Sequence, residues 1–83
     1  SLPPNHPDLA QSYNNIGNVH YNMENYPKAL SYYEKAYEIR QQSLPPNHPD
    51  LAQSYNNIGN VHYNMENYPK ALSYYEKAYE IRQ

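Results

Sequence analysis

The fold of this chain is decided by residues 7–40, which read PDLAQSYNNIGNVHYNMENYPKALSYYEKAYEIR and return unchanged as residues 49–82. In the first half of this stretch, bulky residues recur at alternating intervals of four and three positions: Leu9, Tyr13, Ile16, His20 and Met23. That spacing places all of them on one face of an α-helix. We therefore predict a helix over residues 7–24.

Both ends of this helix carry sequence signals. Pro7 suits the first helical turn, where its missing amide hydrogen is not needed, and His6 or Asn5 would cap the helix. Asp8 places negative charge in the first turn, where the helix dipole favours it. At the other end, we expect Asn25 to take the left-handed backbone conformation that closes many helices.

The second half of the stretch predicts another helix, over residues 27–43. Its inner face is again marked by helical spacing and consists of Tyr26, Ala29, Leu30, Tyr33, Ala36, Tyr37 and Arg40. Pro27 stands where a first-turn proline is tolerated. The helix should stop at Leu44-Pro45-Pro46, because a residue that precedes proline avoids the helical conformation.

The chain consists of two copies of one unit, because residues 43–83 repeat residues 1–41 letter for letter. We divide it into repeats 1–42 and 43–83, and we expect helices over 49–66 and 69–83 in the second repeat. An internal period of roughly 20–50 residues is typical of a solenoid. The prediction is an all-α fold, an α-solenoid of two helix-turn-helix repeats in which neighbouring helices run antiparallel.

Composition and charge exclude several classes of protein. The 83 residues contain no cysteine, which excludes a disulfide framework, a cysteine-ligated zinc site and a thiol nucleophile. No apolar run approaches the length of a membrane span, and no basic and apolar N-terminal segment marks a signal peptide. A net charge of −2 disfavours binding to nucleic acid. We expect a chain that is compatible with the cytoplasm and binds neither membranes nor nucleic acid.

Both glycines of the chain, Gly17 and Gly59, fall inside predicted helices. Glycine is less favourable than alanine there by about 1 kcal/mol. We expect a side chain of the second helix to approach so closely that a Cβ atom is excluded, and Tyr33 is the candidate for Gly17. A hinge or a ligand contact is the alternative explanation.

Aromatic and small residues follow a characteristic order along both helices. They read Tyr13-x-x-Ile16-Gly17-x-x-His20 and then Tyr26-x-x-Ala29-x-x-x-Tyr33-x-x-Ala36. This pattern resembles the tetratricopeptide repeat (TPR) family, with histidine at a position where that family prefers tyrosine. The unit length of 42 residues and the segment HPDLA, residues 48–52, further resemble the repeats of kinesin light chains.

The resemblance implies a right-handed superhelix in which the first helix of each pair lines a concave groove for peptides. The candidate groove residues are those of the first helices that do not face a second helix. They are Gln11, Asn14, Asn15, Asn18, Tyr21, Asn22, Gln53, Asn56, Asn57, Asn60, Tyr63 and Asn64.

Most of these groove candidates are asparagines, which favour the helix less than alanine, lysine or glutamate do. A carboxamide both donates and accepts hydrogen bonds, so it could bind the backbone of an extended peptide. It could equally bond to the next repeat or to solvent. Every lysine and arginine falls in a second helix, so we expect neutral or aromatic peptides rather than acidic C-termini.

Catalysis and metal binding have little support in the sequence. The four histidines, His6, His20, His48 and His62, lack the close pairing that zinc sites use. No serine has a histidine at a motif spacing that could activate it. We predict a non-enzymatic protein with no metal site and no cofactor.

The identity of the two repeats predicts exposed ends. Natural arrays carry polar terminal caps, whereas here the first helix presents Leu9, Tyr13 and Ile16, and the last presents Tyr75 and Tyr79. Two repeats also fall below the roughly three that a stable array needs. We expect a piece of a longer array of identical repeats, natural or designed, whose chains stack head to tail. The functional hypotheses are a peptide-binding scaffold and, alternatively, a structural consensus array that self-associates without a dedicated ligand.

Overall fold

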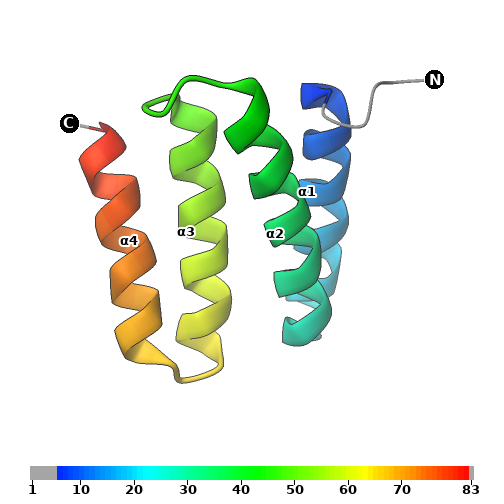
Figure 1. The fold of residues 1–83 in the computed structure, drawn as a ribbon. Helices are drawn as coiled ribbons and strands as arrows, with labels where there is room; N and C mark the ends of the chain where they lie inside the picture. Colours follow the sequence, from blue (N-terminus) through cyan, green and yellow to red (C-terminus); the bar gives the residue numbers. More distant parts are fainter. Residues whose placement is uncertain (1–5, 83) are drawn as a thin grey trace.

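The computed structural model describes residues 6–82 of the chain, which form four helices and, within that range, no strand (Figure 1). The helices are α1 (Pro7–Asn22), α2 (Tyr26–Ser43), α3 (Pro49–Asn64) and α4 (Tyr68–Arg82). The predicted all-α fold of two helix-turn-helix repeats is confirmed. Gln83, the predicted end of the last helix, lies outside the described residues.

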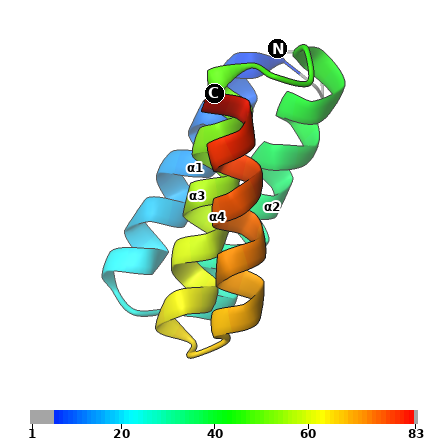
Figure 2. The same cartoon turned by 90° about the vertical axis from the view of Figure 1, so that its left-hand side faces the viewer.

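The helices are arranged in two layers, with α1 and α3 in one and α2 and α4 in the other (Figure 2). Consecutive helices run antiparallel, and α2 contacts both its own partner α1 and the following helix α3. The Cα atoms span 37 × 31 × 13 Å, so the molecule is flat. The right-handed superhelix that the resemblance implies stays a prediction.

Both first helices of the repeats begin at a histidine cap, and His6 is one of the two residues predicted for that role. The Nδ1 atom of His6 accepts a hydrogen bond from the amide of Asp8 at 3.0 Å, and His48 accepts one from Asp50 at 3.1 Å. Each bond satisfies one of the amide groups that the first helical turn leaves without a partner.

The same helices end earlier than predicted, at Asn22 and Asn64 rather than at residues 24 and 66. Glu24 and Glu66 take the left-handed conformation, with φ angles of 61° and 64°. The prediction that Asn25 does so is therefore wrong.

Two backbone hydrogen bonds explain why the left-handed residue is Glu24 and not Asn25. The amide of Glu24 donates to the carbonyl oxygen of Tyr21 at 3.0 Å, and the amide of Asn25 donates to that of His20 at 2.8 Å. This pair of bonds is the Schellman closure, which requires the left-handed residue directly after the C-cap, here Met23. Glutamate therefore adopts a conformation that glycine would adopt with less strain.

The two helices of a repeat approach most closely at the glycines. A Cβ atom added to Gly17 would lie 2.7 Å from two ring carbon atoms of Tyr33, well inside van der Waals contact. The predicted approach of Tyr33 is confirmed. The same contact recurs in the second repeat between Gly59 and Tyr75, at 2.9 Å.

An apolar cluster between α2 and α3 joins the repeats. Ala29 and Tyr33 of α2 pack with Ile58 and Val61 of α3, and all four side chains are buried. Partly buried residues surround this cluster: Tyr21, Tyr26, Leu30, Tyr37 and Tyr74. A helix pair thus buries its outer face only where it meets the next pair, as in other repeat proteins.

The connection between α2 and α3 runs over the surface. Pro45, Pro46 and Asn47 are exposed. The amide of His48 donates to the carbonyl oxygen of Pro45 at 3.1 Å. Surface loops with small or polar residues are where chains best tolerate change.

Candidate functional site

The layer of α1 and α3 carries the candidate groove residues. Those that are exposed are Gln11, Asn15, Asn18, Asn22, Gln53, Tyr63 and Asn64. Those that are half-buried are Tyr21, Asn56, Asn57 and Asn60, and Asn14 is buried.

Two hydrogen bonds between α1 and α3 join four of these side chains across the repeats. The Asn57 amide donates to Oδ1 of Asn14 at 2.7 Å, and the Asn64 amide donates to the hydroxyl of Tyr21 at 2.8 Å. Bonding to the next repeat, one of the two roles considered for the asparagines, therefore holds at these positions. Asn14 is a correction to the groove candidates, because a buried side chain is not open to a peptide.

Asn18 and Asn60 each accept a hydrogen bond from the second helix of their own repeat, and their place in a peptide groove stays a prediction. The hydroxyl of Tyr33 donates to Oδ1 of Asn18 at 2.5 Å, and the hydroxyl of Tyr75 donates to Oδ1 of Asn60. The physical reason is the glycine contact, because a tyrosine ring that lies over Gly17 brings its hydroxyl to the adjacent residue.

Arg40 forms a buried polar link between the repeats. Its guanidinium donates to Oε1 of Gln11 and Oε1 of Gln53, both at 3.1 Å, and to the hydroxyl oxygen of Ser54 at 3.0 Å. It also donates to the backbone oxygen of Asp50 at 3.3 Å. Burial lowers the pKa of Arg40, and the nearby Asp50 opposes this shift. The planar fork of arginine suits several acceptors at once.

This role of Arg40 was missed at the sequence level, where the residue was assigned only to the inner face of its helix. One signal was available in the sequence, because Arg40 is a charged residue on a helix face that is otherwise apolar and aromatic. A charge buried on such a face requires hydrogen-bond acceptors nearby. Two groove candidates, Gln11 and Gln53, supply part of them.

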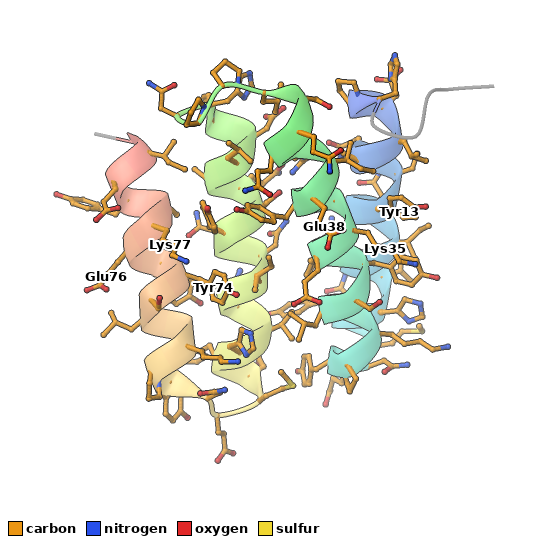
Figure 3. All side chains as sticks on the ribbon, in the orientation of Figure 1. Tyr13, Lys35, Glu38, Tyr74, Glu76 and Lys77 are labelled. Carbon is orange, nitrogen blue, oxygen red and sulfur yellow. The ribbon has the colours of Figure 1, made fainter. Side chains whose placement is uncertain are left out.

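The opposite layer, α2 and α4, carries lysines that lie over tyrosine rings (Figure 3). The Nζ atom of Lys35 lies 5.6 Å from the ring centre of Tyr13, and Nζ of Lys77 lies 5.3 Å from that of Tyr74. Both distances fall within the range of cation–π attraction. These lysines are therefore partly engaged by the protein itself.

A cavity of about 470 Å³ opens on this layer beside Lys77. Its walls include Glu34 and Glu38 of α2 and the tyrosine pair Tyr37 and Tyr55. The hydroxyl groups of the pair lie 3.0 Å apart. Burial and this hydrogen bond raise the pKa of Tyr55 to about 12, so its hydroxyl stays protonated at neutral pH.

The two histidines inside the helices pack as aromatic rings. His20 stacks on Tyr32 with ring centres 5.6 Å apart, and His62 stacks on Tyr74 at the same distance. Their Nδ1 atoms are buried and make no hydrogen bond to another described residue. Each histidine ring thus packs against a tyrosine ring of its own repeat.

The candidates for end-to-end stacking lie at the two ends of the helix array. Ile16 and Tyr79 are exposed, whereas Leu9, Tyr13 and Tyr75 are half-buried. Leu9 and Tyr13 pack against the buried cluster of Ala10, Ala36 and Ile39 in their own repeat.

Two further observations concern function classes. Within residues 6–82, no group of three or more histidine, aspartate or glutamate side chains is arranged to hold a metal ion. None of the helices in that range is both long enough and apolar enough to cross a membrane.

Comparison with known proteins identifies a family. The family model described as tetratricopeptide repeat matches residues 5–83. No curated protein matches the chain. The narrower likeness to kinesin light chain repeats stays a prediction. Because the match spans nearly the whole chain and the helix pairs follow the same repeat, this protein belongs to the tetratricopeptide repeat family.

Proposed function

We propose that this chain is a non-enzymatic scaffold for protein–protein interaction, which binds an extended peptide across the exposed side chains of α1 and α3. Membership of the tetratricopeptide repeat family supports the general role. The observation that supports this face is its exposed row of carboxamides, contributed by Gln11, Asn15, Asn22, Gln53 and Asn64.

Carboxamides suit the backbone of an extended peptide because they can donate to its carbonyl groups and accept from its amides. Gln11 and Asn15 are already held in place by a mutual hydrogen bond of 3.0 Å, which reduces the entropy lost on binding. Asn22 is exposed, and its carboxamide makes no hydrogen bond to another residue within 6–82.

The charge of this face favours a neutral peptide. The guanidinium of Arg40 is buried and already donates to four oxygen acceptors, so it has little capacity left for a carboxylate. Lys35 of α2 and Lys77 of α4 belong to the opposite layer, where their ammonium groups lie over tyrosine rings. None of these three cations is therefore available to bind the carboxylate of an acidic C-terminus on the α1 and α3 face.

A peptide array tests the proposal. Asn15→Ala and Asn22→Ala should each weaken binding about fivefold, since one hydrogen bond contributes about 1 kcal/mol. Alanine favours the helix more than asparagine does, so a loss of helix cannot explain weaker binding. Asn47→Ala, in the exposed loop after α2, is the matched control and should bind as the parent chain does. Equal binding by all variants, or no binding at all, would reject this face.

A second candidate function is a structural array in which identical chains associate head to tail. The observation that favours it is the exposure of large apolar side chains at both ends of the helix array, among them Ile16, Val19, Leu72 and Tyr79. Sedimentation over a range of concentrations separates this candidate from a monomeric scaffold.

A further inference from the structure

The exposed surface of α3 and α4 carries an apolar cavity of about 200 Å³. Five residues line it: Tyr63, Tyr68, Ala71, Leu72 and Tyr75. Tyr68 and Leu72 are exposed, so the cavity opens directly to solvent. We call this surface the tyrosine cavity.

The same five residues occur one repeat earlier as Tyr21, Tyr26, Ala29, Leu30 and Tyr33. There they are covered, because all of them pack in one cluster with Ile58 and Val61 of α3. Ile58 is 2% exposed and Val61 is 0% exposed. The internal contact between the repeats thus shows what fits against this set of residues.

The residues that would fill the tyrosine cavity are present at the other end of the same chain. Ile16 and Val19 of α1 occupy the repeat positions of Ile58 and Val61, yet they are 39% and 57% exposed. The two faces are therefore the separated halves of a contact that the protein already makes once. Side chains packed at interior density match in shape as well as in polarity.

We propose that a second copy of this chain docks its α1 on the tyrosine cavity, in the register of the internal contact between α2 and α3, with Ile16 and Val19 as the inserted side chains. The proposal rests on the second candidate function and specifies its contact. A further pair fits the same register. Tyr79 is exposed and would meet Tyr13 of the second copy as Tyr37 meets Tyr55, hydroxyl to hydroxyl at 3.0 Å.

Such a contact joins two different faces, so each added chain leaves one α1 face and one tyrosine cavity free. Association of this kind does not close and produces a growing filament rather than a symmetric dimer. This open-ended growth distinguishes the proposed contact from any contact that uses one face twice.

Two variants isolate the two faces. Val19→Glu and Leu72→Glu change side chains that are exposed in the single chain, so neither should disturb the fold. In the docked state, a carboxylate at either position would meet an apolar surface without a partner, which should weaken association on the order of a hundredfold. Ser31→Glu and Ser73→Glu add the same charge at positions that are exposed in the single chain, and Ser31 stays exposed although the next repeat packs on its helix.

Sedimentation velocity over a wide concentration range, with helicity followed by circular dichroism, reads the outcome. The parent chain and both controls should form species that grow beyond a dimer as concentration rises. Each of Val19→Glu and Leu72→Glu should stay monomeric alone. Their equimolar mixture should form a 1:1 dimer that grows no further, since one variant keeps an intact cavity and the other an intact α1 face.

A parent chain that stays monomeric throughout, a mixture that does not pair, or controls that lose association like the two variants would each overturn the proposal. Peptide binding by the monomeric Val19→Glu chain is measured separately, so failure of the α1 and α3 peptide face is distinguishable from failure of the docking contact.

Discussion

Gly17 and Gly59 are each covered by a tyrosine ring, but only the ring over Gly17, that of Tyr33, is also packed against the next repeat. Replacing each glycine with alanine in turn tests whether this packing holds Tyr33 in place. Inside a helix, alanine is more favourable than glycine by about 1 kcal/mol, so open space at either position would make the change stabilising. At Gly17, however, the new Cβ atom would lie 2.7 Å from two ring carbons of Tyr33. That is about 0.8 Å closer than the shortest favourable separation of carbon atoms.

Tyr33 has little freedom to move away. It is 3% exposed, it packs against Ile58 and Val61, and its hydroxyl donates to Asn18. Overpacking of this kind costs about 1–3 kcal/mol. After the gain in helix propensity of about 1 kcal/mol is subtracted, Gly17→Ala should lower the free energy of unfolding by up to about 2 kcal/mol.

Gly59→Ala should behave differently although the local sequence is the same. Its Cβ atom would lie 2.9 Å from the nearest ring carbon of Tyr75, but that ring is half-buried and lines the open tyrosine cavity. The ring can shift into this space, so the steric cost and the helix gain should nearly cancel. We expect a change within about 0.5 kcal/mol of zero.

Urea unfolding followed by far-UV circular dichroism measures both free energies, at a concentration where sedimentation shows monomers. Equal losses at both glycines would contradict the idea that α3 holds Tyr33 in place. A stabilising effect of Gly17→Ala would contradict the close contact itself.

Three further substitutions have expected outcomes. Glu24→Gly, and likewise Glu66→Gly, should raise the free energy of unfolding by about 1 kcal/mol in urea titrations, because glycine takes the left-handed conformation without the steric strain. Burial and Lys70 lower the pKa of His62, against an opposing effect of Glu34. The unfolded chain therefore binds a proton more readily, and stability should fall as the pH drops from about 6.5 through the lower folded pKa. His62→Phe should remove that part of the pH dependence in urea titrations at several pH values. Arg40→Lys should lower the free energy of unfolding by about 1–3 kcal/mol, since an ammonium cannot reach all the acceptors of the guanidinium, and an unchanged value would show that the link is dispensable.

The helices and their order followed from the sequence because two independent signals agreed. The alternating spacing of Leu9, Tyr13 and Ile16 marks the inner face, and the cap at His6 marks the start. The close approach of Tyr33 to Gly17 also followed, because an unfavourable glycine inside a helix needs a compensating contact.

The helix ends were placed too late because composition alone points to Asn25 as the left-handed residue, whereas the Schellman hydrogen bonds impose that conformation on Glu24. Side-chain propensity is weaker than a pair of backbone hydrogen bonds. The turn is thus determined by where the carbonyl groups of His20 and Tyr21 lie.

The partners of the asparagines could not be obtained from one helix in isolation. Asn57 bonds to Asn14, and Asn64 to Tyr21, at a separation of 43 residues, one more than the repeat length. The extra residue reflects the axial register in which α3 packs beside α1. The periodicity of a single helix does not contain this register. The same limitation concealed the acceptors of Arg40.

The exposed loop between α2 and α3 has a consequence for how such a gene can change in length. A tandem duplication that begins in the codons for Pro3, Pro4 and Asn5 and ends at the corresponding codons for Pro45, Pro46 and Asn47 would insert one whole helix pair, together with both halves of the contact between α2 and α3. The lengthened chain would need no compensating substitution, because each inserted face meets the residues it already fits. Copying errors at this loop can therefore alter the length of the protein while the fold is kept.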